Sequence, residues 1–386
     1  MYLNQLLTAM KKTLITLLLS LVLMVPSFAQ TTSKPEKLIF TPVVENKATA
    51  VKNQASSGTC WCFATISLLE SELLRMGKGE YDLSEMFVVR NNYVDKLKNN
   101  YIRRGSGNLG QGSFAHDVIR VLKNKGIVPD EVYTGLNYGS PTHSHSEMQS
   151  FLDAVGGVAV KLKRESDQYN QIVKSILDTY LGEYPSQFTY KGVSYTPQSF
   201  ANSLGLNPDD YVEITSYTHW PFYEMGVLEV PDNWTMNSFY NVPIDELVEI
   251  ADYALQNGYT FSWDADVSEP GFLHANGVAQ LLPSNYVAPA DNNSAIRVNE
   301  VIASQTYRQE TFENFTTTDD HLMHITGIAK DQFGKKYYKV KNSWGTERNN
   351  LGGYLYASEN YFRGKTVSIL INKNAIPPAI RKKLGL

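Results

Sequence analysis

The sequence predicts an α+β fold with a helical lobe and a strand-rich lobe that face each other across a cleft. The first observation is a helix pattern over residues 61–76, apolar nearly all round in its first half and ended by Gly77. The second is a series of strand patterns between residues 322 and 371, which indicates an antiparallel sheet or a partly open barrel. With 386 residues, 42% of them hydrophobic, the chain is long enough for one large domain or two close lobes.

The first helix is predicted to begin at a cysteine. Ser56, Ser57 and Gly58 favour a turn, and the helix pattern starts directly after Cys60. A thiol at the first turn of a helix has its pKa lowered by unpaired backbone N–H groups, and the thiolate is the reactive form. The side-chain amide of Gln54, six residues earlier, could donate to an oxyanion that forms beside the sulfur. The alternative is an inert buried thiol with Gln54 as a turn residue.

Between the first helix and the late strands the chain reads mainly as helices. The loop over residues 283–298 is rich in Pro, Asn, Ser and Ala and is expected at the surface. The predicted strands are 37–44, 259–266, 322–328, 336–340, 353–357 and 366–371, and the predicted helices after the first are 146–155, 168–181, 196–204, 244–257 and 379–383.

The motif around Cys60 resembles that of the papain-type cysteine peptidases. Its Ser-Ser-Gly-x-Cys-Trp form is more similar to the bleomycin hydrolase and aminopeptidase C branch. His321 stands in Asp-Asp-His-Leu-Met-His-Ile-Thr-Gly and Asn342 in Lys-Asn-Ser-Trp-Gly, both of which resemble motifs of that family. Further matches are Asp82-Leu-Ser-Glu, Gly110-Gln-Gly and Tyr240-Asn-Val-Pro-Ile-Asp, so the similarity covers nearly all of residues 40–376.

The resemblance implies a papain-like, two-lobed fold that fills residues 30–386. The nucleophile and the histidine of papain-like chains lie about 130–150 residues apart, whereas 260 residues separate Cys60 from His321 here. We therefore expect a large, mostly helical insertion from about residue 138 to 240.

The resemblance also implies the roles of the site residues. His321 would take the proton from Cys60, and Asn342 would fix the histidine ring by accepting its other N–H. Trp344 would shield that bond from solvent. Asp320 either supports the charge of the histidine or is a plain surface carboxylate.

Two glycines, Gly110 and Gly112, could let the backbone of a substrate approach closely, because glycine has no side chain to obstruct it. Loop flexibility is the competing explanation.

Other reactive side chains are weaker candidates. His324 lies three residues after His321, so in a strand it points to the opposite face. His143 and His145 lie in a Ser-rich turn without a third ligand. Cys62 is too poorly placed to form a disulfide with Cys60, and with two cysteines in the chain a metal site is not expected. We predict no cofactor.

The N-terminus reads as a targeting signal. Residues 1–29 carry two lysines, an apolar run and a cleavage site with small residues, which predicts an exported protein, periplasmic or secreted. The apolar run is too short for a stable membrane span. A net charge of −4 gives no indication of nucleic-acid binding.

The predicted function is an exported cysteine peptidase that hydrolyses peptides through a thioester on Cys60. In the resembled branch the C-terminus of the chain blocks the cleft so that peptides are trimmed from a free N-terminus, and the resemblance also implies a homo-hexamer. Here residues 372–386 resemble the segment before that blocking arm. Aminopeptidase activity is therefore favoured, and the alternatives are an endopeptidase with an open cleft, a peptide-binding protein, or acyl transfer to an amine.

Overall fold

The computed structural model describes residues 36–287 and 295–386. The chain divides into two units, Met1–Glu36 and Lys37–Leu386, and the fold described below is that of the second. The predicted signal peptide, residues 1–29, and part of the predicted 283–298 loop lie outside the described residues.

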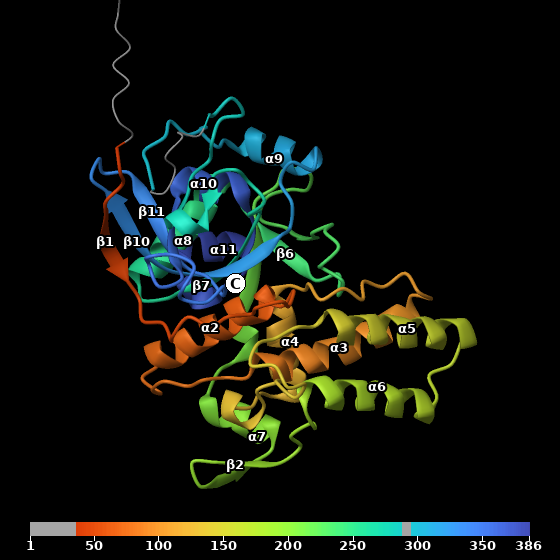
Figure 1. Ribbon diagram of the computed structural model, residues 1–386. Coiled ribbons are helices and arrows are strands. Elements are labelled where there is room, and N and C mark those ends of the chain that lie inside the picture. The colour runs from red at the N-terminus through yellow and green to blue at the C-terminus, as the bar shows by residue number, and fades with distance from the viewer. Residues whose placement is uncertain (1–35, 288–294) are drawn as a thin grey trace, which may run out of the picture. The chain divides into compact units, whose positions relative to one another are not determined.

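The second unit is an α+β structure (Figure 1). Its α-helices are α2 Cys60–Arg75, α3 Glu85–Ile102, α4 Ala115–Lys125, α5 Ser146–Leu162, α6 Asp167–Leu181, α7 Pro197–Leu204, α8 Ile244–Gln256, α9 Gln305–Glu313, α10 Glu359–Lys365 and α11 Pro378–Leu384. Its strands are β1 Phe40–Glu45, β2 Phe188–Tyr190, β3 Val193–Tyr195, β4 Tyr211–Thr215, β5 Met225–Val227, β6 Ser238–Asn241, β7 Phe261–Ala265, β8 Phe272–Leu273, β9 Val278–Ala279, β10 His321–Asp331, β11 Lys336–Lys341, β12 Tyr354–Ser358 and β13 Thr366–Asn372.

One mixed sheet holds every strand except the β2–β3 hairpin. Its order is β5-β6-β4-β13-β7-β10-β11-β12-β9-β8, with β1 also paired to β10. Most neighbours are antiparallel, while β4 with β6 and β12 with β9 are parallel. Strand β10, which begins at His321, is therefore central.

Helices cover both faces of this sheet. On one face α2 packs along β10 and β7, and its apolar side chains join those of α3 to α7 in a common core that includes Leu322 and Leu370. On the other face α8, α10 and α11 pack on apolar side chains from β7, β10 and β13, among them Trp263 and Ile325. In Figure 1 α2 lies between the sheet and the remaining helices of the helical region. The two regions thus meet along α2.

Helix α2 has the length and burial that the sequence predicts. It begins at Cys60, and its residues from Cys60 to Leu73 are all buried. It ends at Arg75, and Gly77 follows with φ +71°, a left-handed conformation that glycine adopts without steric cost.

The expected insertion differs from the structure in its second half. Its helical part is α5, α6 and α7, which ends at Leu204. Strands β4, β5 and β6 follow and join the central sheet, with β4 pairing antiparallel to β13. The expectation of a mostly helical segment up to residue 240 therefore fails after Leu204, because short strands that pair with distant partners carry a weak local pattern.

Within the described part of the chain, none of the helices has the length and apolar character needed to cross a bilayer.

Candidate active site

Cys60 is the first residue of α2. The turn before it is held by Gln111, whose Oε1 accepts from the N–H of Gly58 at 2.7 Å, while its backbone oxygen accepts from Trp61 Nε1 at 3.0 Å. The helix N-terminus thus has a fixed position against the 108–113 loop. Burial raises the pKa of the Cys60 thiol to about 12, a backbone hydrogen bond with Leu322 opposes this rise, and the nearby Asp264 adds to it.

His321 opens β10 and is hydrogen-bonded to Asn342. Its Nε2 lies 2.8 Å from Asn342 Oδ1, which also accepts the backbone N–H of Ser343 at 2.7 Å. Because the Ser343 N–H requires an acceptor, the oxygen of the amide must face this way, and the histidine therefore donates from Nε2. That tautomer leaves Nδ1 as the basic nitrogen. Burial lowers the pKa of His321 to about 4, and the bond to Asn342 partly offsets this effect.

Two aromatic rings surround the His321–Asn342 pair. The ring of Trp344 lies 4.8 Å from that of His321, centre to centre, with an angle of 30° between them. His274 packs on the same tryptophan with a centroid distance of 5.0 Å, and its Nδ1 lies 3.4 Å from Asn342 Nδ2. Burial lowers the pKa of His274 to about 4, so it is neutral at pH 7 and can accept from the amide. The sequence gave no local motif that pointed to His274.

The side chain of Gln54 is held at both ends. Its Oε1 accepts from the hydroxyl of Ser343 at 2.6 Å, and its Nε2 donates to the backbone oxygen of Ser57 at 2.8 Å. The backbone N–H of Gln54 also donates to the oxygen of Ser343, at 2.8 Å. These bonds fix the amide with one N–H left for another acceptor, as an oxyanion donor requires. Ser343, which makes this possible, lies inside the Asn-Ser-Trp-Gly motif.

The glycines at 110 and 112 border the same loop. Lys96 Nζ donates to the backbone oxygens of both residues, which fixes the loop. A Cβ placed on Gly112 would overlap the carboxylate of Asp232, whereas one on Gly110 would meet the Asn108 side chain at 3.1 Å. The close approach at Gly112 is therefore made by a side chain of the protein itself.

Asp320 faces the loop after β7. Its Oδ2 accepts the backbone N–H groups of Val267 at 3.2 Å and of Ser268 at 3.0 Å. Its charge slightly raises the pKa of the neighbouring His321, against the larger effect of burial. Asp320 thus shapes the segment beside the histidine.

The rival side chains have other partners. His324 is bonded through Nδ1 to Ser67 of α2 at 2.8 Å, two turns beyond Cys60. The Cys62 sulfur lies 3.3 Å from the backbone oxygen of Glu85 on α3, and both cysteines are free thiols. His143 and His145 have ring centres 5.9 Å apart. No cluster of three or more potential ligands suited to a metal ion occurs among residues 36–287 and 295–386.

The geometry therefore joins the predicted residues in two groups. His321, Asn342 and Trp344 form one group on the sheet side, and Gln54 is tied to it through Ser343. Cys60 stands at the end of α2 beside β10, where the backbone of Leu322 contacts its sulfur. A thiol next to a histidine that an amide orients is an arrangement for nucleophilic catalysis.

Comparison with known proteins agrees with this geometry. The sequence profile described as the peptidase C1-like family matches residues 112–385. The chain belongs to the peptidase C1-like family. The profile covers His321 and Asn342, whereas Cys60 and Gln54 precede the matched range.

Relatives in the bleomycin hydrolase and aminopeptidase C branch extend the match over most of the chain. Cysteine proteinase 1, mitochondrial, of Saccharomyces cerevisiae is 22% identical over 91% of this chain and 80% of its own length. Aminopeptidase C of Streptococcus thermophilus is 23% identical over 84% and 80%. The crystal structure of PepW from Lactobacillus rhamnosis has a TM-score of 0.69 at 21% identity, over 89% of this chain and 84% of that one. This member of the peptidase C1-like family is a cysteine-type peptidase.

Proposed function

We propose that this peptidase acts through Cys60, with His321 as its proton carrier, in a papain-like arrangement of two lobes. The observation that carries the proposal is the 2.8 Å bond from His321 Nε2 to Asn342 Oδ1, because it leaves Nδ1 as the base. The proton of the thiol passes to this nitrogen as the sulfur attacks the peptide carbonyl carbon. Gln54 Nε2 and the backbone N–H of Cys60 stabilise the oxyanion that forms.

The tetrahedral intermediate collapses when the C–N bond breaks and His321 donates its proton to the leaving amine. The thioester on Cys60 is then hydrolysed by water, which loses a proton to His321 as it attacks. The second collapse breaks the C–S bond, releases the acid and returns the proton to the sulfur. Asn342 orients the ring throughout, and Trp344 shields the bond between them.

Chemical labelling tests this assignment. An epoxide inhibitor directed at papain-type thiols is expected to label Cys60 and to abolish hydrolysis, and Cys60→Ala should have no activity. Cys62→Ser serves as the matched control, since its hydroxyl can still donate to Glu85, and it should remain active. Labelling of Cys62 alone, or full activity of Cys60→Ala, would refute the proposal.

The preferred activity is that of an aminopeptidase, because relatives of similar length carry the names aminopeptidase C and aminopeptidase G. The alternative is cleavage within a chain. Matched peptides with free and acetylated N-termini separate the two: trimming of the free peptide alone supports the aminopeptidase, and internal cuts in the acetylated peptide support the endopeptidase. Comparison of hydrolysis with aminolysis of one peptide ester tests for acyl transfer.

The proposed location is outside the cytoplasm, with residues 1–29 as a cleaved signal peptide. Protein recovered from the periplasm or the medium should begin at Gln30 by N-terminal sequencing. Recovery of the whole enzyme from the cytoplasm with residues 1–29 intact would contradict this.

A further inference from the structure

Three carboxyl groups lie near the Cys60 thiol without being used in the chemistry described above. They belong to Asp264 on β7, Asp319 in the segment before β10, and Asp232 in the loop before β6. Each of them raises the pKa of Cys60, in the order Asp264, Asp319, Asp232. Since electrostatic interactions weaken with distance, the three acids stand around the nucleophile.

Asp264 is buried without a hydrogen-bond donor. It is 1% exposed, and neither of its carboxylate oxygens has a partner among the described residues; the same holds for Oδ2 of Asp319. The two carboxyl groups contact each other, and such a contact is favourable only if a proton lies between them. Burial, and then the neighbouring acids, raises the pKa of Asp264 well above its usual range and that of Asp319 to about 8. The pair therefore holds negative charge poorly in the absence of a cation.

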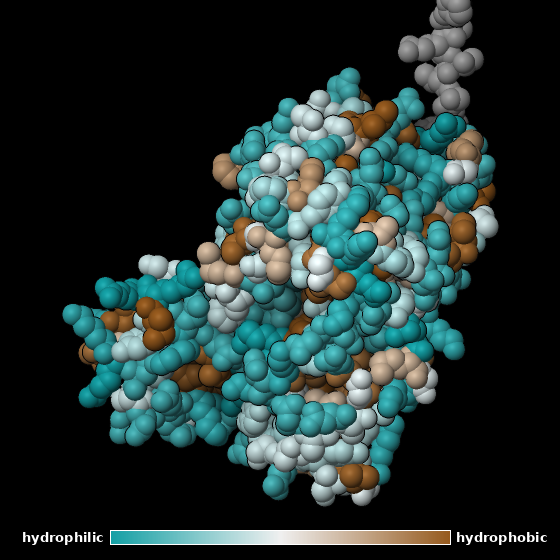
Figure 2. All heavy atoms as spheres, turned by 180° about the vertical axis from the view of Figure 1, so that it is seen from behind, coloured by the Kyte–Doolittle hydropathy of each residue, from teal (hydrophilic) through white to brown (hydrophobic). Residues whose placement is uncertain are grey.

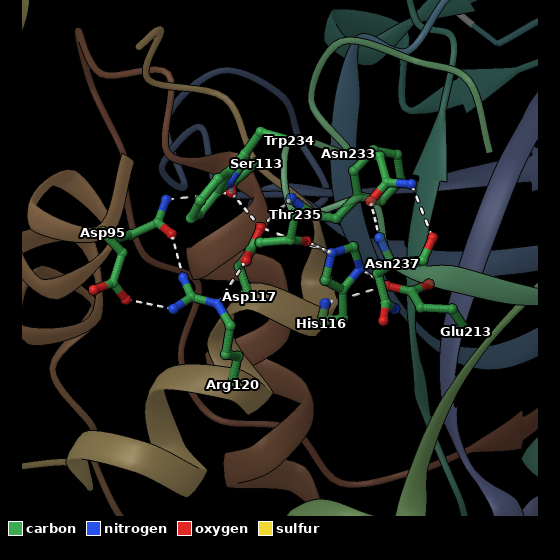
Figure 3. Close-up of polar contacts among 12 residues, drawn as sticks. Asp95, Ser113, His116, Asp117, Arg120, Glu213, Asn233, Trp234, Thr235 and Asn237 are labelled. Atoms are coloured by element: carbon green, nitrogen blue, oxygen red, sulfur yellow. Dashed lines mark hydrogen bonds and ion pairs between the residues drawn. The ribbon is translucent and has the colours of Figure 1, made fainter. Parts of the chain in front are cut away.

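Other buried acids in this part of the molecule do have partners (Figure 3). Glu213 accepts from the backbone N–H and Nδ1 of His116, both at 3.1 Å, and Asp117 accepts from Arg120 Nε at 3.0 Å. The shortage of donors is thus particular to Asp264 and Asp319.

The register of the sheet aims Asp264 at the Cys60 side. It pairs with Leu322 of β10, whose backbone contacts the Cys60 sulfur. Side chains two residues apart on a strand share a face, and Ser262, two residues before Asp264, lies 3.4 Å from Thr65 of α2. Asp264 therefore faces the helix that carries the nucleophile.

Asp232 approaches from the helical side. Its loop is fixed by hydrogen bonds from Trp234 Nε1 to Ser113 at 2.7 Å and between Thr235 and His116 Nε2 at 2.9 Å, which Figure 3 shows. Its carboxylate occupies the space beside Gly112. The acids thus come from both sides and border the Gly110–Gly112 loop. In the described residues no hydrogen bond links them to the Gln54, Asn342 and Ser343 network, where the oxyanion and the leaving amine are handled.

The ends of the chain do not supply a cation here. Lys383 of α11 is bonded to Glu246 at 2.6 Å, and Leu384 is buried in the core on the far face of the sheet. Nor do the acids form a group suited to a metal ion within the described residues. An organic cation on the substrate remains as the chemistry that fits.

We propose that Asp264 and Asp319, together with Asp232, form a subsite that binds an ammonium group of the peptide on the acyl side of the scissile bond, in the first place its free α-ammonium. The inference rests on the proposed peptidase function and names the residues that select the substrate. Binding brings one positive charge to the acid pair, and the shared proton leaves to solvent.

Binding to a Cys60→Ala protein tests the subsite without turnover. Two peptides of one sequence, with free and acetylated N-termini, are titrated by calorimetry. We expect the free peptide to bind at least tenfold more tightly, and Asp319→Asn or Asp264→Asn to bring the ratio close to one. Glu249→Gln, which removes an exposed charge on α8, should leave the ratio unchanged. Equal affinities before substitution, or an unchanged ratio in folded Asn variants, would overturn the proposal.

A third peptide identifies the source of the ammonium. It is acetylated and carries a lysine two residues before the expected cleavage site. Tight binding that Asp319→Asn removes supports the subsite with a side chain as its ligand, and weak binding supports the α-ammonium. The two proposals fail separately: discrimination by Cys60→Ala without cleavage by the intact enzyme refutes the peptidase assignment, whereas cleavage without discrimination refutes the subsite.

Discussion

At the level of single residues, burial drives Cys60 and His321 toward their neutral forms. The thiol pKa rises to about 12 and the imidazole pKa falls to about 4 when each is considered in its own surroundings. A reactive thiolate then depends on transfer of the proton to His321, since an imidazolium beside the sulfur stabilises its negative charge.

Alkylation of the thiol measures this dependence. In a Cys62→Ser background, which leaves Cys60 as the only cysteine, adding His321→Ala should slow iodoacetamide modification at pH 7 by at least about tenfold. The reason is that a thiol with a raised pKa holds less thiolate at any given pH. The rate of the variant should keep rising well above pH 9. Equal rates with and without His321 would show that the imidazole does not activate Cys60.

The acid pair predicts a cost in stability. An acid whose folded pKa is raised keeps its proton in the folded state after the unfolded chain has lost it, so stability falls as pH rises from about 4 to the folded value. For Asp319 that value is about 8. We expect Asp319→Asn to raise the melting temperature at pH 8 by about 1–4 °C and to change it little at pH 4.

Thermal melts of both proteins across this pH range decide the matter. A variant that is less stable than the native protein at pH 8 would contradict the prediction. Stabilisation accompanied by loss of ammonium selectivity would mean that the two acids are kept for function at the expense of stability.

At the level of structural elements, the contact between the 342–345 loop and Gln54 controls the oxyanion donor. Removing the Gln54 amide with Gln54→Ala should lower kcat by about 100-fold or more. Ser343→Ala removes only the bond to Oε1, and the amide keeps its bond to Ser57, so we expect a smaller loss of about 3–10-fold. Steady-state kinetics on one peptide measures both; a larger effect of Ser343→Ala than of Gln54→Ala would show that Ser343 acts in another way.

The elements that the sequence predicts well are those with strong local patterns. Helix α2 has a turn before it, a continuous apolar run and a terminal glycine, and it begins at Cys60 as expected. The strands β10 to β13 follow their alternating patterns closely. The short strands β4 to β6 were missed because their pairing with β13 brings together residues more than 150 positions apart.

The same reason explains which site residues the sequence missed. His274 meets Asn342, and Asp264 and Asp232 meet the Cys60 region, only through the folded sheet and loops. No spacing along the chain indicates such neighbours. Ser343 was within reach of sequence reasoning, since it adjoins Asn342 in the motif.

At the level of the whole molecule, several large apolar side chains remain exposed on α5 and α6. Phe151 and Val158 are 50% exposed, Leu162 64% and Ile172 51%. Figure 2 shows brown patches at the end of the molecule that α3, α5 and α6 form. Clustered apolar side chains on a surface favour association. Together with the hexamer implied by the resemblance, they lead us to expect self-association through these helices.

Light scattering at micromolar concentration should therefore give a mass several times that of one chain. The double variant Phe151→Glu, Leu162→Glu places charges in the proposed contact and should give the mass of one chain, because buried unpaired charges weaken an interface by several kcal/mol. Ile302→Glu is the matched control, since Ile302 is 82% exposed in the segment before α9 and the charge there should not change the mass. Hydrolysis of short peptides per chain should survive dissociation, because Cys60, His321, Asn342 and Gln54 all come from one chain. A single-chain mass for the native protein would remove the assembly, and with it any role of caging in limiting access to the cleft.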